Sequence, residues 1–146
     1  MEFKLSTRRS DGVSIVDLDG KITSGDALAA FRQLIRDEVS QGHNKILLNL
    51  KEVSYIDSSG LGELVMALGT VEQTICGSCG ATVFKDEDGN WESCTQCQSN
   101  ERKRWGELKL SNAGRQVTDL LQFTKLYTVF DVHPSEKEAL ESFSRK

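Results

Sequence analysis

Short apolar runs of strand length alternate with helical spacings of apolar residues along this chain, and this alternation constrains its fold most. Runs at 2–6 and 13–18 flank a turn at 10–12, which predicts an opening hairpin. Because strands and helices alternate, right-handed crossovers should produce an α/β fold. We therefore predict a mixed, mostly parallel sheet with an N-terminal hairpin and about four helices.

The first helix is predicted over about 25–41, with Ser24 or Thr23 as its N-cap and Gly42 at its end. Its apolar residues recur every three or four positions. They are Leu28, Phe31, Leu34, Ile35 and Val39.

A compact apolar run at 45–50 predicts a buried central strand, and 53–56 leads from it into the turn 57–60. A second helix is predicted to start at this turn, since apolar residues again recur at three- and four-residue steps from Leu61 to Val71.

Later in the chain we predict a strand at 107–110, a helix at 113–123 and a strand at 127–132. The last helix should begin at Ser135, which forms a capping-box pair with Glu138. Four aromatic residues lie on apolar stripes and are predicted to belong to the core: Phe31, Phe123, Phe130 and Phe143.

Size and charge exclude several classes of protein. The 146 residues (16.2 kDa) suffice for one domain with a small appendage. A net charge of −4 has the wrong sign for neutralising phosphate backbones, so we expect no nucleic acid partner. The longest run without Asp, Glu, Lys or Arg covers 73–84, shorter than the roughly 20 residues of a spanning helix. The N-terminal sequence lacks the apolar stretch of a secretion signal. We expect no membrane insertion and a cytoplasmic location.

The four cysteines form two C-x2-C pairs, Cys76 with Cys79 and Cys94 with Cys97, separated by fourteen residues. A reducing compartment keeps thiols free, and this spacing is close to that of zinc sites. Four thiolates leave no open coordination position, so the pattern predicts a structural zinc ion. Two disulfides or a redox pair are the alternatives.

The cysteines lie in a segment, 75–105, that interrupts the alternation and that we interpret as an insertion resembling a zinc ribbon. Its hairpin should turn at 88–90. The basic run 102–104 is either a solvated face or part of a second docking surface for a protein. On the first interpretation, Trp91 and Trp105 pack the ribbon.

The turn 57–60 joins a buried strand to a helix, and ligands of α/β proteins often bind at the carboxyl ends of strands. On the simplest interpretation, Asp57 and Ser58 are helix caps, and Gly60 and Gly62 allow close packing. Alternatively, the helix N-terminus allows Ser58 to carry an anion without unfolding the helix. A hydrolase is disfavoured because the turn is not a G-x-S-x-G elbow. The two histidines, His43 and His133, are interpreted as surface or packing residues.

The sequence YIDSSGLGELVMAL at 55–68 resembles the signature of STAS domains, in particular the bacterial anti-sigma factor antagonists. The resemblance covers roughly 12–74 and 106–143. It implies a STAS domain formed by 1–74 and 106–146, with 75–105 inserted where ordinary members have a short connection.

This resemblance implies that an anti-sigma factor serine/threonine kinase phosphorylates Ser58, with Ser59 as the alternative acceptor. The unphosphorylated form would bind that kinase and release the sigma factor, and a serine phosphatase would reset the phosphorylated form. Such a protein is a binding module and not an enzyme. The expected partner-binding residues are Asp57, Ser58, Ser59, Gly60, Leu61 and Gly62.

Two other roles remain open. A STAS domain can regulate a transporter or bind a small ligand or lipid, and the ribbon could bind nucleic acid. If the ribbon bound nucleic acid, its affinity would fall steeply as the salt concentration rises. The sequence leaves the oligomeric state undetermined.

Overall fold

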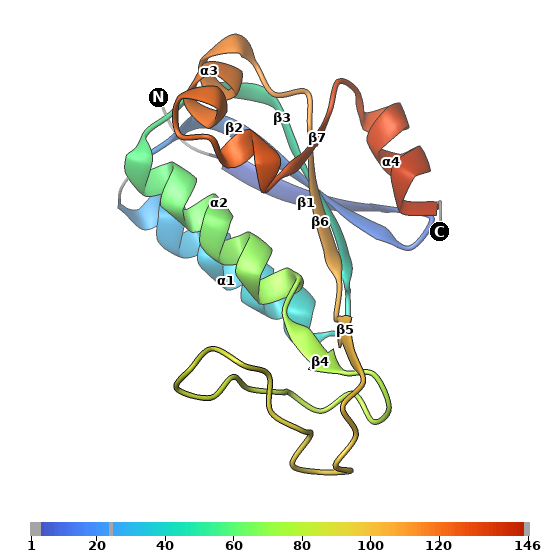
Figure 1. Ribbon diagram of the computed structural model, residues 1–146. Coiled ribbons are helices and arrows are strands. Elements are labelled where there is room, and N and C mark those ends of the chain that lie inside the picture. The colour runs from blue at the N-terminus through green and yellow to red at the C-terminus, as the bar shows by residue number, and fades with distance from the viewer. Residues whose placement is uncertain (1–3, 24, 145–146) are drawn as a thin grey trace.

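The computed structural model describes residues 4–23 and 25–144, which form a five-stranded sheet with helices on both faces (Figure 1). Only the β1–β2 pair is antiparallel, and the other three neighbouring pairs are parallel. This confirms the predicted mixed, mostly parallel α/β sheet. In spatial order the strands are β1 (Lys4–Ser10), β2 (Val13–Ile22), β3 (Lys45–Ile56), β6 (Glu107–Ser111) and β7 (Asp131–His133).

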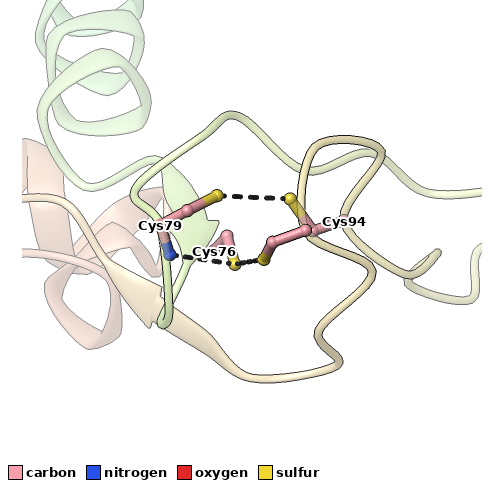
Figure 2. Close-up of side chains that lie close together, drawn as sticks. Cys76, Cys79 and Cys94 are labelled. Carbon is pink, nitrogen blue, oxygen red and sulfur yellow. Dashed lines mark hydrogen bonds between the residues drawn. The ribbon is translucent and has the colours of Figure 1, made fainter.

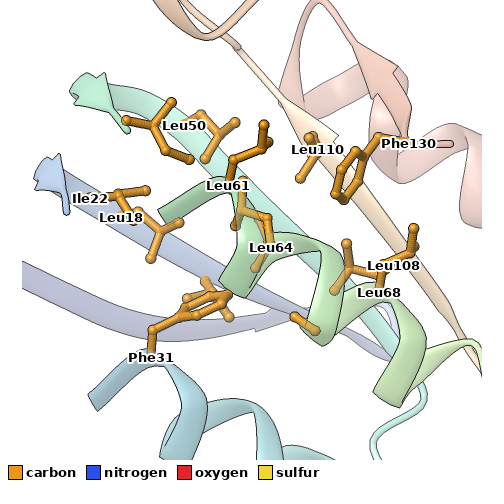
Figure 3. Close-up of a cluster of buried hydrophobic side chains, with 14 of the residues drawn as sticks. Leu18, Ile22, Phe31, Leu50, Leu61, Leu64, Leu68, Leu108, Leu110 and Phe130 are labelled. Carbon is orange, nitrogen blue, oxygen red and sulfur yellow. The ribbon is translucent and has the colours of Figure 1, made fainter. Parts of the chain in front are cut away.

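In the described part of the chain, four α-helices and one short 3₁₀ helix cover the sheet: α1 (Asp26–Ser40), α2 (Ser58–Val71), α3 (Arg115–Phe123), η1 (Leu126–Thr128) and α4 (Glu136–Ser144). The main core lies between the sheet and helices α1 to α3, where Leu18, Phe31 and Leu64 pack together (Figure 3). A smaller cluster lies on the other face, where Ala139 and Phe143 of α4 cover β2 and β3. Within the described residues, no helix combines the length and apolarity needed to cross a membrane.

The opening hairpin forms as predicted. Ser10 pairs with Val13, and the two residues between them have positive φ angles, 50° at Asp11 and 81° at Gly12. Positive φ at both central positions is the geometry that fits the twist of a two-residue hairpin. The hairpin places β1 at the edge of the sheet.

Helix α1 ends as predicted but begins differently. Gly42 has a φ of 82°, and the N–H of His43 donates to the carbonyl of Glu38 at 2.9 Å, which satisfies the last turn. The N-cap is Gly25, with no side-chain capping bond, so Thr23 is not the cap. The alternative cap, Ser24, lies outside the described residues.

Helix α4 begins close to the predicted position. The hydroxyl of Ser135 accepts a hydrogen bond from the N–H of Glu138 at 3.2 Å, which is one half of the predicted capping box. Helix α3 begins at Arg115, two residues later than predicted.

The predicted strand at 127–132 is wrong. Lys125 has a φ of 64°, which turns the chain after α3 into the 3₁₀ helix η1. The hydroxyl of Thr128 caps this turn by donating to the carbonyl of Lys125 at 3.0 Å. Only Asp131–His133 then pairs with β6, so the apolar run before it serves as a connection.

Three of the four predicted core phenylalanines are buried, and Phe123 is not. Phe31, Phe130 and Phe143 are at most 4% exposed, whereas Phe123 is 87% exposed. Helix α3 buries Leu121, and a residue two positions later points about 200° away around the helix axis. The stripe on α3 therefore ends before Phe123.

The cysteine-containing segment follows α2 and lies outside the five-stranded sheet, beyond the C-terminal end of that helix (Figure 1). Its base is a two-stranded antiparallel sheet of β4 (Thr74–Cys76) and β5 (Arg102–Arg104). Its hairpin turns over 86–90, where the N–H of Asp86 donates to the carbonyl of Asn90 at 2.8 Å. Trp91 packs under the side chains of Lys85 and Arg102.

Candidate functional site

The turn between β3 and α2 presents two serine hydroxyls to solvent. Asp57 is the N-cap of α2, and its Oδ1 accepts a hydrogen bond from the N–H of Gly60 at 2.8 Å. Ser58 is therefore the first helical residue and not the cap, and both Ser58 and Ser59 are exposed. Because Asp57 caps the helix, the serine side chains are available for other contacts.

Gly60 allows this turn to pack directly against the end of β2. A Cβ at Gly60 would lie 2.2 Å from the carbonyl oxygen of Ile22, which already accepts the N–H of Asp57 at 3.2 Å. No side chain fits in that space. Gly62 differs because a Cβ there would have no neighbour within 4 Å. Close packing therefore explains Gly60 and does not explain Gly62.

The predicted contact residues divide between the surface and the interior. Gly60 and Leu61 are buried, and Leu61 is only 4% exposed because it packs in the main core. The surface of the turn is formed by Ser58, Ser59 and Gly62, with Asp57 half-buried beside them.

The two serines have different surroundings on α2. Residues four apart share a helix face, so Ser58 lies one turn before the bare Gly62 and Ser59 one turn before Glu63. Glu63 is 8% exposed and forms an ion pair with Arg32 of α1. Ser58 therefore has open space along its face, whereas Ser59 has a carboxylate one turn away.

Gln116 holds α3 against the end of β3, and sequence reasoning missed it. Its Oε1 accepts the N–H of Ile56 at 2.9 Å and its Nε2 donates to the carbonyl of Ile56 at 2.9 Å. Beyond Asn49, β3 extends past its pairing with β6, so this side chain replaces a missing strand neighbour. A lone glutamine in a helix gives no sequence signal for that role.

The two C-x2-C pairs lie in loops of the same geometry, 76–81 and 94–99. In each loop the N–H of the first cysteine donates to the carbonyl five residues later, at 2.8 and 2.9 Å. The carbonyl of the first cysteine accepts the N–H four residues later, at 3.0 and 2.8 Å. The residue that donates this second hydrogen bond has a positive φ in both loops, 80° at Gly80 and 64° at Gln98.

These loops bring all four sulfur atoms within 4.8 Å of one another. The Sγ atoms of Cys79 and Cys94 face each other at 3.5 Å (Figure 2). The Sγ atoms of Cys76 and Cys97 are 3.6 Å apart. A tetrahedron with Zn–S bonds of about 2.3 Å has edges of about 3.8 Å. The cysteines are thus clustered within the range that a single tetrahedral ion requires.

Backbone N–H groups favour the thiolate form of the first cysteine in each C-x2-C pair. The N–H groups of Cys79 and Ser78 point at the Sγ of Cys76, at 3.5 and 3.4 Å, and lower its pKa to about 6. The pKa of Cys94 is also lowered, chiefly by the N–H of Cys97. Because the thiolate is the metal ligand, these donors suit a metal site.

The cysteine cluster and the serine turn lie at opposite ends of α2. This helix has 14 residues, so its ends are about 21 Å apart. At its C-terminal end, the carboxylate of Glu72 accepts the N–H of Leu108 at 3.0 Å and forms an ion pair with Arg104 at 3.2 Å. Glu72 thus joins the end of α2 to both β5 and β6.

Comparison with known proteins identifies the fold around the serine turn. The family model of the STAS domain matches residues 4–76. This chain belongs to the STAS domain family. The match includes the STAS strands β1 to β3 and helices α1 and α2, and with them the turn 57–60. No curated protein matches the chain in sequence.

Solved structures with the same fold include anti-sigma factor antagonists. One from Mycobacterium paratuberculosis is 18% identical, with a TM-score of 0.67 over 97% of this STAS protein and 93% of the other chain. SpoIIAA of Bacillus in its phosphorylated form is 19% identical (TM-score 0.59; 97% and 99% covered). SpoIIAA in its unphosphorylated form is 17% identical (TM-score 0.57; 97% and 97% covered). At these identities the likeness establishes the fold alone.

Proposed function

We propose that this STAS protein is an anti-sigma factor antagonist that phosphorylation of Ser58 switches off. Unphosphorylated, it binds an anti-sigma factor serine/threonine kinase, which then releases its sigma factor. A serine phosphatase restores the binding form. The protein acts by binding and not by catalysis, and we place it in the cytoplasm, where ATP is available and thiols stay reduced.

The observation that carries this proposal is the exposed hydroxyl of Ser58 at the first position of α2. A phosphate there adds about −1.5 to −2 charges and three acceptor oxygens next to the positive end of the helix dipole. The helix N-terminus tolerates that charge, and Asp57 already caps the helix through Gly60. The scaffold therefore stays folded while the charge of its surface changes.

The surroundings of the two serines favour Ser58 over Ser59 as the acceptor. A phosphate on Ser59 would lie one helical turn from the Glu63–Arg32 ion pair, where it would repel the carboxylate and compete with it for Arg32. A phosphate on Ser58 would point toward the N-terminus of α2, and Gly62 one turn later carries no side chain, which leaves open space on that face. The same open space lets a kinase approach the helix closely.

Loss of binding follows from desolvation. A partner that covers Ser58, Ser59 and Gly62 would have to strip water from a dianion without supplying a counter-charge. That costs several kcal/mol, and each 1.4 kcal/mol or so weakens binding tenfold. Gly60 and Leu61 support this surface from beneath.

Incubation with the kinase partner and ATP, followed by mass spectrometry, tests the assignment. We expect one phosphate on Ser58, no incorporation into Ser58→Ala, and normal incorporation into the matched control Ser59→Ala. The phosphorylated protein should bind the kinase at least tenfold more weakly in calorimetry. Phosphate on another residue, or equal affinity of the two forms, would refute the switch. A chain that accepts no phosphate would instead favour the transporter-regulating or ligand-binding role.

We further propose that the four cysteines hold a structural zinc ion and that 75–105 is an inserted ribbon within a STAS domain of 1–74 and 106–146. The support is the tetrahedral spacing of the sulfur atoms and the two matching loops. Four thiolates complete the coordination, so the ion would supply folding free energy and not catalysis. Protein purified under reducing conditions should contain one zinc per chain by elemental analysis. A content near zero would exclude the site.

A further inference from the structure

We propose that the cysteine cluster is also an oxidation site, at which a two-electron oxidant such as hydrogen peroxide forms two crossed disulfides, Cys79–Cys94 and Cys76–Cys97, and expels the metal. This site is separate from the phosphorylation switch because it lies at the other end of α2. The inference rests on which sulfur atoms are exposed and which partner each of them faces.

Each pair across the cluster combines an exposed cysteine with a buried one. Cys79 and Cys97 are exposed, whereas Cys94 and Cys76 are buried. The Sγ of exposed Cys79 lies 3.5 Å from that of Cys94, and the Sγ of exposed Cys97 lies 3.6 Å from that of Cys76. We expect an oxidant to react first at the exposed cysteine of each pair, and the sulfur of its buried partner lies within 3.6 Å of it.

The chemistry balances with peroxide as the only added reactant. The thiolate of Cys79 attacks one peroxide oxygen, which breaks the O–O bond, releases hydroxide and leaves a sulfenic acid. The thiolate of Cys94 then attacks that sulfur, forms the S–S bond and releases a second hydroxide. Cys97 and Cys76 react in the same way. Two peroxides are reduced, four thiolates are oxidised, and the ion leaves because its ligands are consumed.

The crossed pairing has a structural consequence that pairing within each C-x2-C would lack. Disulfides between the loops 76–81 and 94–99 keep them joined after the metal has left, and each sulfur pair needs to close by only about 1.5 Å to reach bonding distance. Disulfides within each loop would leave the two loops unconnected. Oxidation and chelation should therefore produce different metal-free ribbons.

Trypsin distinguishes the two pairings in the full-length protein. Between Lys51 and Arg102 the chain has a single tryptic site, after Lys85. Cleavage places Cys76 and Cys79 on peptide 52–85, and Cys94 and Cys97 on peptide 86–102. Crossed disulfides keep these peptides together until a reductant is added, whereas disulfides within each pair let them separate.

The experiment treats zinc-loaded protein with hydrogen peroxide and follows zinc with a chromogenic chelator. We expect release of one zinc per chain, loss of all four titratable thiols, and a linked 52–85/86–102 species that fragmentation assigns to 79–94 and 76–97. Dithiothreitol with zinc should restore the thiols and the metal. Separate peptides, the pairing 76–94 with 79–97, or metal retained under peroxide would each overturn the proposal. Ser58→Ala should oxidise like the natural protein, since its change lies at the far end of α2.

Discussion

Replacing Gly60 with alanine should destabilise the fold far more than the same change at Gly62 or Gly69, the other glycines of α2. The new Cβ would lie 2.2 Å from the carbonyl oxygen of Ile22 and 2.9 Å from Cγ1 of Ile56. Relief requires the backbone of β2 or α2 to move by more than 1 Å, which also breaks the hydrogen bond from Asp57 to Ile22 and the cap on Gly60. Overpacking costs about 1–3 kcal/mol and a lost cap about 1 kcal/mol, so we expect a loss of about 3 kcal/mol.

Gly62→Ala is the matched control, because it makes the same chemical change two residues later on the same helix. Apart from the neighbouring backbone of α2 itself, no atom lies within 4 Å of its Cβ position, so alanine should stabilise the helix by about 0.5–1 kcal/mol. Urea unfolding of both variants measures the two effects. With a slope of about 2 kcal/mol per M, Gly60→Ala should lower the midpoint by roughly 1.5 M. Equal midpoints for the two variants would refute the contact on which the placement of the serine turn depends.

Three further predictions concern other parts of the fold. Glu72→Ala should lower the free energy of unfolding by about 1–3 kcal/mol, because it leaves the buried N–H of Leu108 without an acceptor. Glu72→Gln should lower it less, because the amide oxygen can still accept that N–H, and thermal unfolding measures both variants. Arg8 lowers the pKa of Asp17 by hydrogen bonding, so the ion pair stabilises the fold above the ordinary pKa of about 3.9 and is lost as pH falls below it. Asp17→Asn should therefore lower stability by at most about 1 kcal/mol at pH 7 and by less at pH 3, in urea titrations at both values. Chelation under reducing conditions should abolish amide-exchange protection in 76–99 before the main sheet loses any, and simultaneous loss in both would contradict a separately folded ribbon.

The sequence predicted most of the fold because its elements have distinct periodicities. The alternation of strand-like and helical segments indicated the parallel sheet, and two apolar runs around a turn that contains Gly12 indicated the hairpin. The prediction failed after α3, where an apolar run at 127–132 has the composition of a strand. Lys125 adopts a left-handed conformation there and starts a 3₁₀ helix, so only Asp131–His133 pairs with β6.

The candidate sites divide in the same way. The cysteine spacing and the DSSG turn can be read as local patterns, since the ligands and the cap lie within a few residues of each other. Gln116 could not be found because its partner, Ile56, is sixty residues away and the contact depends on how far β3 extends past β6. The requirement for glycine at Gly60 likewise comes from the end of β2 and not from the turn itself.

By itself the sequence determined most of the order of strands and helices, a helix cap at Asp57 or Ser58 and the pairing of cysteines in two C-x2-C motifs, because each depends on residues that are close along the chain. Only the tertiary structure decided that Asp57 and not Ser58 caps α2, that both serines are exposed, and that Glu63 pairs with Arg32 of α1. It alone also paired each exposed cysteine with a buried one from the other loop. The exposure of a residue, and its distance from residues far away in the sequence, depend on which segments pack against it. Both are therefore decided only when distant segments come together in the fold.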